Sequence, residues 1–224
     1  QYKLWNKNNK VYKIIKYNKS AINSDNTESL GFFRSIIVSD GIINVFSPPK
    51  SLNYNNFCSR FKEVECICEE LIEGTMINLF YDSDVNQWEI STKTSVGANV
   101  CFFKDQPTFS ELFIEICNEL NITFDQLPKD VCYSFVMQHP KNRFVIPITR
   151  KCLYIITAYR INNNTCEICE LSREEILSLS INNVLVPYRF TFNNYNDLML
   201  HYGSSNTPSY VMGIVIRNIN GERT

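Results

Sequence analysis

The sequence predicts an α+β domain with largely antiparallel sheets, and two hairpin signals are the first support for this prediction. Asp40-Gly41 separates two apolar runs, Phe32–Val38 and Ile42–Phe46, and an Asp-Gly pair in that position is typical of a tight hairpin turn. Met76–Tyr81 and Gln87–Thr92 flank a polar stretch and predict a second hairpin. Helices that interrupt such hairpins, without alternating with every strand, favour the α+β class.

Three helices are expected between these strands. Thr108–Glu111 is a capping box, whose side chains satisfy the first free N–H groups of a helix, and apolar residues at helical spacing follow over 112–120. Ser172–Glu175 is a second capping box and predicts a short helix. Tyr195–Tyr202 has helical apolar spacing, and Gly203 closes it.

Further strands are expected at Val131–Met137, Phe144–Ile148, Leu153–Ile161 and Tyr210–Arg217. Asn218–Gly221 then predicts a turn, which should lead into one more strand. No repeat or Pro/Ser-rich linker divides the chain, so residues 1–224 are interpreted as a single domain.

Composition narrows the class of function. The net charge of −1 excludes nucleic-acid binding driven by the field of the whole molecule, so any polyanion site must be a local patch. Nine cysteines without a short disulfide framework indicate reduced thiols and an intracellular, cytoplasmic protein. No apolar run approaches the roughly 20 residues of a membrane span, so no membrane partner is expected. Frequent Asn, Ile, Tyr and Lys indicate an AT-rich genome, which is compatible with a virus, such as a large DNA virus, with a parasite or with a cytoplasmic element.

The usual catalytic sets are absent from the sequence. Neither a Walker A loop nor a G-x-S-x-G elbow occurs, and His201 on a predicted helix suits a structural role. Cys166 and Cys169 have metal-ligand spacing but no second pair at a matching distance, so no metal site is predicted. Dispersed groups remain, each of which also fits an ordinary surface charge or turn: Arg34, Lys50, Glu73-Gly74-Thr75 and Lys93.

In their order along the chain, these groups resemble the motifs of phage-type RNA ligases, the tRNA-repair ligases. The resemblance runs from Tyr12 to Gly221 and rests on the following segments: Phe33-Arg34-Ser35-Ile36, Pro49-Lys50-Ser51-Leu52-Asn53, Leu71-Ile72-Glu73-Gly74-Thr75, Ser91-Thr92-Lys93-Thr94-Ser95, Tyr133-Ser134-Phe135-Val136, Asn142-Arg143-Phe144-Val145 and Met212-Gly213-Ile214-Val215. It implies a nucleotidyltransferase fold, like a ligase adenylation domain, with antiparallel sheets flanked by helices. The family's last motif, a lysine-rich strand, would follow Thr224, so the resemblance implies a domain truncated before that strand and further C-terminal or protein partners.

Three functional groups of the family differ here. The lysine that attacks the α-phosphorus of ATP corresponds to Leu71, which has no nucleophile. Two glutamates that help to hold metal and nucleotide correspond to Ser134 and Met212, which argues against Mg²⁺ because divalent ions prefer carboxylate ligands. The positive groups are retained.

Three hypotheses follow. The leading one is a catalytically inactive domain that binds ATP, another nucleotide, an RNA end or a cap-like ligand, with phosphate or nucleotide contacts at Arg34, Lys50, Glu73, Gly74 and Lys93. The second is an active ligase or nucleotidyltransferase with Lys50 as a displaced nucleophile. The third is a scaffold within a larger assembly, whose cleft is filled by Leu71 and Met212.

Overall fold

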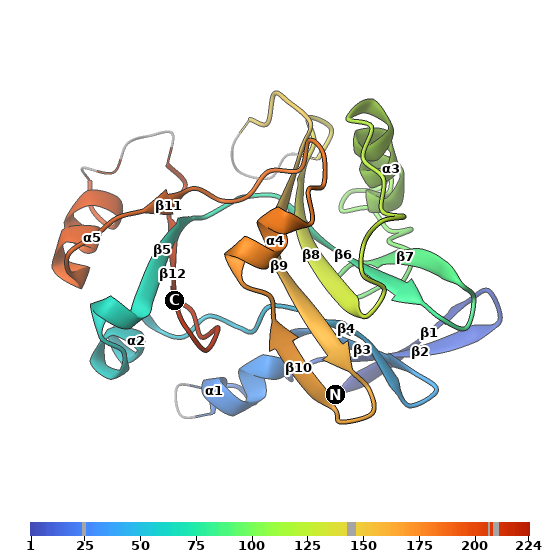
Figure 1. Cartoon of the computed structure of the whole chain (residues 1–224), viewed down its shortest axis with the longest axis horizontal. Helices are drawn as coiled ribbons and strands as arrows, with labels where there is room; N and C mark the ends of the chain where they lie inside the picture. The colour runs from blue at the N-terminus through green and yellow to red at the C-terminus, as the bar shows by residue number, and fades with distance from the viewer. Residues whose placement is uncertain (24–25, 143–146, 206, 208–210) are drawn as a thin grey trace.

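A five-stranded antiparallel sheet forms the centre of the molecule (Figure 1). The computed structural model describes residues 1–23, 26–142, 147–205, 207 and 211–224. In spatial order the central strands are β10 (Glu167–Glu170), β9 (Cys152–Asn162), β8 (Val131–Gln138), β6 (Thr75–Asp82) and β7 (Gln87–Ser91).

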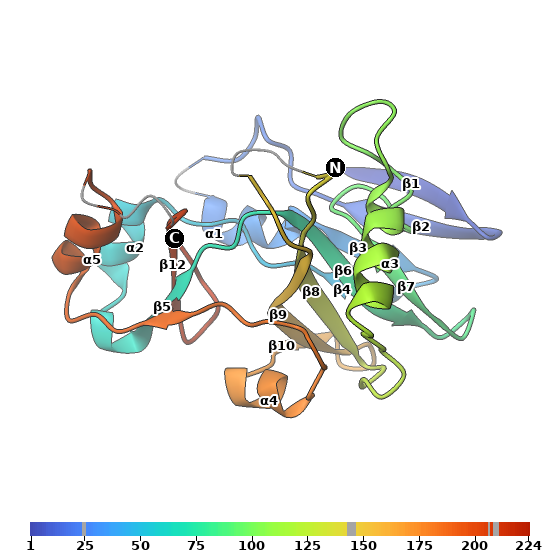
Figure 2. The ribbon, with the colours of Figure 1, turned by 90° about the horizontal axis from the view of Figure 1, so that it is seen from above.

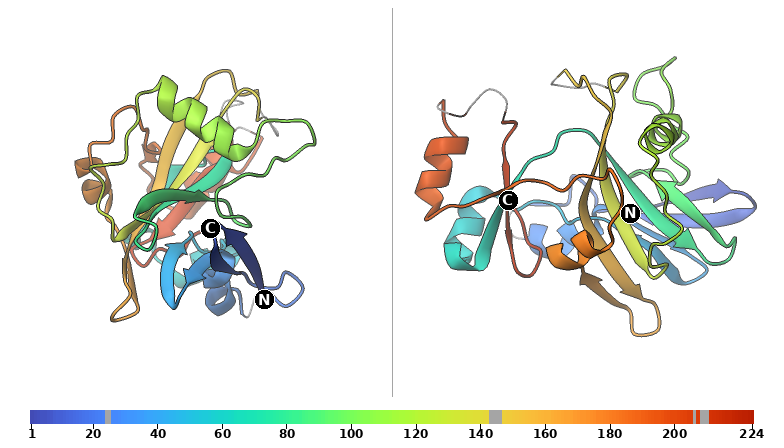
Figure 3. Two further views of the ribbon diagram at one scale, coloured as in Figure 1. Left: turned by 90° about the vertical axis from the view of Figure 1, so that its right-hand side faces the viewer. Right: turned by 45° about the horizontal axis from the view of Figure 1, so that its top comes forward.

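The helix α3 (Phe109–Glu119) covers one face of this sheet (Figure 3, left). It begins at the predicted capping box, where Thr108 and Glu111 bond each other's backbone N–H groups. Successive side chains of a strand point to opposite faces. On β8, Tyr133 and Phe135 therefore pack on the α3 side, while Cys132 belongs to the core on the other face.

A four-stranded sheet packs against the opposite face of the central sheet. Its strands, in spatial order, are β1 (Tyr2–Lys7), β2 (Lys10–Ile15), β3 (Ile36–Ser39) and β4 (Ile42–Phe46). The core between the two sheets includes Tyr12, Phe46 and Tyr159, all buried. The two hairpin turns use residues that tolerate positive φ, namely Asn8 and Asn9 in the first and Asp40 and Gly41 in the second.

A smaller sheet lies at the end of the molecule opposite the β1–β2 hairpin (Figure 2). Its strands are β11 (Arg189–Phe190), β5 (Cys66–Glu70) and β12 (Ile214–Asn218). The helices α2 (Tyr54–Arg60) and α5 (Tyr195–Tyr202) cover one face, where Phe57, Cys68 and Ile216 are buried together. After a turn, residues 222–224 return beside β12, and the N–H and carbonyl of Ile216 both pair with Thr224, at 3.1 and 3.0 Å.

Short helical segments connect the sheets. They are α1 (Thr27–Leu30), the 3₁₀ turns η1 (Gly31–Arg34) and η2 (Glu63–Glu65), and α4 (Arg173–Ser178), which follows the predicted capping box at Ser172. Among the described residues, no helix combines the length and the apolar character that are needed to cross a membrane.

The α+β class, both hairpins and the three helices are confirmed. One boundary is wrong: Phe32 to Arg34 belong to η1, so the strand that was expected from Phe32 begins only at Ile36. The reason is a kink at Phe33 (φ −82°, ψ 42°), whose carbonyl accepts the N–H of Tyr17. The expected strands at 144–148 and 210–217 fall partly outside the described residues, although Ile214–Asn218 is a strand.

Candidate functional site: a cleft between two sheets

A cavity of about 290 Å³ lies between the central sheet and the small sheet. Met76, Val136 and Ile156 line it from the central sheet, and they come from β6, β8 and β9. From the small sheet come Glu69, Val215 and Arg217, and Leu71 lines the cavity directly after β5. Val215 lies opposite Glu69 in the β5–β12 register, which puts both on the face turned away from α2 and α5. The cavity therefore has an apolar floor and charged walls.

Leu71 and Gly74 stand at one edge of this cavity. Leu71 directly follows β5, its N–H donates to the Gly213 carbonyl at 3.0 Å, and its side chain is 42% exposed. Gly74 precedes β6 with φ +150°, and a Cβ there would lie 2.4 Å from the carbonyl oxygen of Met137. Only glycine permits both this backbone conformation and this approach to β8. The segment 71–75 thus enters its strand at the cavity, with an apolar side chain where the resembled family has a lysine.

Ser134 faces the same side of the central sheet as the cavity but is fully buried. Its hydroxyl donates to the Asn78 Oδ1 at 2.8 Å, and the amide of Asn78 donates to the hydroxyl of Ser47 at 3.1 Å. An uncharged network with its hydrogen bonds made therefore occupies the position where the resembled family has a glutamate. Met212 is half-buried and is not among the residues that line the cavity.

Arg34 and Arg223 bring positive charge to the cavity. Arg34 ends η1, and burial together with the nearby Arg223 lowers the pKa of its guanidinium. Arg223 is only 6% exposed, and its Nε and Nη2 atoms have no hydrogen-bond partner among the described residues. Neither arginine forms an ion pair with a described carboxylate. Two like charges therefore meet at the cavity without a counter-ion among the described carboxylates, an arrangement suited to an anionic ligand.

Lys93 extends this positive region. Its backbone carbonyl accepts the hydroxyl of Ser35 at 3.2 Å, and its ammonium lies 5.3 Å from the ring centre of Tyr17. Burial and then the neighbouring Arg34, Lys19 and Lys16 lower the pKa of Lys93. Lys93 is therefore close to Arg34, although it does not itself line the cavity.

Lys50 and Glu73 are placed differently. Lys50 lines a neighbouring cavity that shares Ser51 with the first, and its ammonium donates to the Ser51 carbonyl at 3.3 Å. Glu73 is half-buried, its carbonyl accepts the Gln138 amide at 2.9 Å, and it does not line the cavity. Of the sequence-predicted phosphate-binding residues, Arg34 and Gly74 line the cavity with Leu71, while Lys50, Lys93 and Glu73 lie around it.

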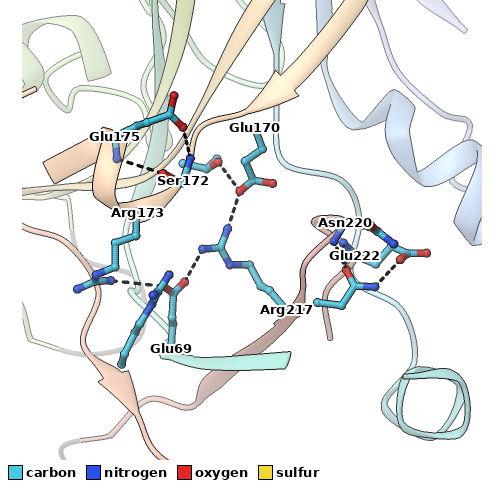
Figure 4. A network of polar contacts seen from close by, with 11 residues as sticks. Glu69, Glu170, Ser172, Arg173, Glu175, Arg217, Asn220 and Glu222 are labelled. Atoms are coloured by element: carbon cyan, nitrogen blue, oxygen red, sulfur yellow. Dashed lines mark hydrogen bonds and ion pairs between the residues drawn. The ribbon is translucent and has the colours of Figure 1, made fainter. Parts of the chain in front are cut away.

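Arginine–glutamate pairs form the wall that Arg217 and Glu69 contribute (Figure 4). Arg217 bonds Glu69 at 2.8 Å and Glu170 at 2.6 Å, so it links the small sheet to β10 of the central sheet. Glu69 is 5% exposed and also contacts Arg189 at 3.0 Å and Arg173 at 3.4 Å. This wall is held by mutual ion pairs, in contrast to Arg34 and Arg223, which pair with no carboxylate among the described residues.

The residues at this site do not fit a divalent metal. Among the described residues, no three His, Cys, Asp or Glu side chains gather closely enough to hold one. The hydroxyl of Ser134 is already engaged, and the carboxylate of Glu69 is paired with arginines. We therefore derive no chemical step that runs through a metal.

The fold is that of known ligases. An Aquifex aeolicus protein described as an ATP-dependent DNA ligase superposes with a TM-score of 0.64 at 14% identity, over 99% of this chain and 57% of that protein. An archaeal ATP-dependent RNA ligase superposes with a TM-score of 0.61 at 14% identity, over 98% and 56%. A Naegleria gruberi RNA ligase mutant gives 0.53 at 11% identity, over 90% and 64%. The chain has the ligase nucleotidyltransferase fold.

Because the sequence identities are low, the similarity establishes the ligase fold and nothing further. The chain spans between 56 and 64% of the length of the three ligases. No family model matches the sequence, and no curated protein matches it significantly.

Sequence reasoning missed Arg217, Arg223 and Glu69. A strand assignment for Cys66–Glu70 would have placed Cys68 on one face and Glu69 on the other, which is the signal for Glu69 that was missed. The sequence around Arg223 gives no local sign that this residue reaches the cavity. It reaches the cavity because residues 222–224 pair back onto β12, where Arg223 lies opposite Arg217.

Proposed function

We propose that this domain binds a phosphate-bearing ligand in the cleft and does not form a covalent lysyl-nucleotide at position 71. The ligand class is a nucleotide, an RNA end or a cap-like structure. The observation that supports the proposal most is the pair Arg34 and Arg223, which reach the same cavity as Leu71 and have no carboxylate partner among the described residues. A phosphate would supply the missing acceptor oxygens, and guanidinium–phosphate bonds are among the stronger charge-assisted hydrogen bonds.

The apolar floor supports a ligand with a planar or apolar part beside its phosphate. Val136, Ile156 and Val215 would contact that part, while Lys93 would add longer-range attraction. The Naegleria gruberi ligase mutant was solved with AMP and Mn, so a nucleotide accompanies this fold in that relative. For the present chain we propose binding without the metal, since the described side chains offer no suitable ligand set.

A titration tests the proposal. The protein is titrated with ATP, GTP, a cap analogue and a 5′-phosphorylated mononucleotide, and binding is measured by calorimetry. We expect at least one ligand to bind and the substitution Arg34→Met to weaken it by roughly tenfold or more, as for loss of a charged hydrogen bond. Lys104→Gln, which removes an exposed lysine that does not line the cleft, is the matched control. Absence of binding for every ligand at millimolar concentration would contradict the proposal.

The alternative of an active enzyme requires Lys50 to act as nucleophile. Lys50 lines the neighbouring cavity and its ammonium bonds the Ser51 carbonyl, which does not favour attack on a phosphate held at Arg34. Incubation with radiolabelled ATP or GTP and a divalent metal, followed by denaturing electrophoresis, is decisive. We expect no labelled band, whereas a band that Lys50→Ala abolishes would establish the active alternative.

The scaffold alternative requires a filled cleft. Leu71 remains 42% exposed beside an open cavity of about 290 Å³, so the apolar replacements leave room for a ligand. No direct observation favours the scaffold over a binding domain.

A further inference from the structure

The strand β1 ends the four-stranded sheet, and one of its edges has no neighbouring strand among those described. Gln1 and Lys16 exchange hydrogen bonds between their backbone nitrogen and oxygen atoms, both at 2.9 Å. In an antiparallel pair of strands, such bonded residue pairs alternate with pairs that do not bond each other. The β1–β2 register therefore places Tyr2, Leu4 and Asn6 in the non-bonded pairs, so their N–H and carbonyl groups point out of the free edge. No other described backbone group bonds them.

The other edge strands that the structure describes are short or covered. On β4, the side chain of Asn163 accepts the N–H of Ile43 at 2.7 Å and donates to its carbonyl at 3.2 Å. On β7, the Ile90 carbonyl accepts the N–H of Gly97 at 2.7 Å, and residues 222–224 cover β12. The strands β10 and β11 have only four and two residues. Because an open edge is a template for another strand, proteins block edges in such ways, whereas the six residues of β1 have no cover within the described chain.

The lysines of β1 restrict how a strand can pair with this edge. Antiparallel pairing of two copies of β1 requires outward-pointing residues to lie opposite each other. In the register that puts Leu4 opposite Leu4 of the second copy, Lys3 lies opposite Trp5. Lys7 then lies opposite Gln1, so no two lysine side chains face each other directly. A shift of two residues in either direction puts Lys3 opposite Lys3 or Lys7, and like charges directly opposite each other destabilise a sheet.

We propose that the free edge of β1 joins two copies of this chain through an antiparallel β1–β1 pair centred on Leu4. Leu4 then pairs with Leu4, and Tyr2 with Asn6 of the second copy, so every outward N–H and carbonyl of these residues has a partner. The two four-stranded sheets become one continuous sheet. The Lys3 ammonium, which lies 4.6 Å from the ring centre of Trp5 in its own copy, also faces the Trp5 ring of the other copy.

Exposed apolar side chains support this contact. Tyr2 and Leu4 are 63 and 56% exposed, and they lie on the face of β1 opposite to that of Trp5. Pairing brings the two Leu4 side chains together at the centre of the contact. The hairpin lies at one end of the molecule, where a second copy can approach (Figure 1). The net charge of −1 opposes the approach little. This inference concerns a different surface from the cleft and does not rest on the proposed function.

Sedimentation equilibrium of the whole chain tests the proposal. Because a contact of one strand from each copy is small and therefore weak, protein concentrations of about 5 to 300 µM are required. We expect a monomer–dimer equilibrium. Leu4→Glu should weaken it about tenfold or more, because two carboxylates would face each other. Within one copy this carboxylate lies opposite Lys13, so the fold should be retained, which urea denaturation checks. The matched control is Val11→Glu, on the same face but on β2, and it should leave dimerisation unchanged within about twofold.

Disulfide cross-linking tests the register and does not depend on the folding of Leu4→Glu. Residues that form a bonded antiparallel pair have Cα atoms about 5.5 Å apart, which a disulfide can span. Leu4→Cys incubated with oxidised glutathione should form a covalent dimer, in which two thiols become one disulfide while the glutathione disulfide is reduced to two thiols. Val11→Cys, which keeps the same nine native cysteines, should cross-link no more than the unmodified chain.

Three results would overturn the proposal. The first is a monomer at every concentration, which would leave the edge to a strand from another protein. The second is a dimer that a folded Leu4→Glu variant does not weaken. The third is a dimer in which Leu4→Cys cross-links no more than Val11→Cys, because the copies would then meet at another surface or in another register.

Discussion

Arg223 allows a test in which function and stability should change in opposite directions. Its guanidinium is buried, two of its nitrogens lack a partner among the described residues, and Arg34 adds like-charge repulsion. Each unmade hydrogen bond of a buried group costs about 1–3 kcal/mol. Arg223→Met keeps an aliphatic side chain of similar reach and removes the charge. We expect the free energy of unfolding to rise by about 1–3 kcal/mol, and the affinity for the phosphate-bearing ligand to fall about tenfold or more.

Urea denaturation and calorimetric titration measure the two effects on the same preparations. For a domain of this size the gain corresponds to a rise in Tm of roughly 2–4 °C per kcal/mol. Arg217→Met is the matched control, because Arg217 lies opposite Arg223 but is paired with Glu69 and Glu170. It should lower the free energy of unfolding, because Glu69 and Glu170 each lose an ion pair, although Glu69 keeps Arg189 and Arg173. If Arg223→Met destabilises the protein as Arg217→Met does, Arg223 is structural and the reasoning is refuted.

Three other perturbations give independent checks. Gly74→Ala should lower the free energy of unfolding by about 3 kcal/mol or more, because its Cβ would meet the Met137 carbonyl oxygen at 2.4 Å. Gly41→Ala, which has open space around it, should lower it by roughly 1 kcal/mol. Equal losses in urea denaturation would contradict this. Burial lowers the pKa of His139, so the free energy of unfolding should be at its full value above about pH 6.5 and fall as the pH drops from there toward the lowered pKa. His139→Gln should flatten that loss between about pH 7.5 and 5.5, and an unchanged slope would exclude His139 as its source. Lys50→Met should change ligand affinity by less than about threefold, because Lys50 lines the neighbouring cavity, and a tenfold loss would place it in the site.

The parts of the fold that the sequence predicted are those whose cause is local. The capping boxes at Thr108 and Ser172 need only a hydroxyl and a carboxylate three residues apart, and both form as expected. The turn at Asp40-Gly41 needs two residues that accept positive φ, and both have it. The ligase fold followed from the order of short motifs along the chain, and the solved ligases confirm that fold.

The parts that were missed depend on contacts between distant segments. The 3₁₀ turn at Arg34 forms where the Phe33 carbonyl meets the N–H of Tyr17, which an apolar run alone does not reveal. Lys50 and Ser51 are adjacent in sequence and both line the neighbouring cavity, yet only Ser51 also reaches the cavity of Leu71, a difference that the sequence does not reveal. The β1–β2 hairpin did carry a local signal, the pair Asn8-Asn9 between alternating residues, and it should have been predicted.

Ser134 and Arg223 differ in how far the described chain satisfies their polar groups. Ser134 forms a hydrogen-bond network with Asn78 and Ser47. The position that corresponds to a metal-binding glutamate of the resembled family is therefore stable without ligand or metal. Arg223 has no such compensation within the described chain, and a buried, unpaired guanidinium lowers stability. A scaffold would gain stability from replacing it with an apolar residue. Under the proposed function, a phosphate bound in this cleft would supply the interaction that offsets the cost of Arg223.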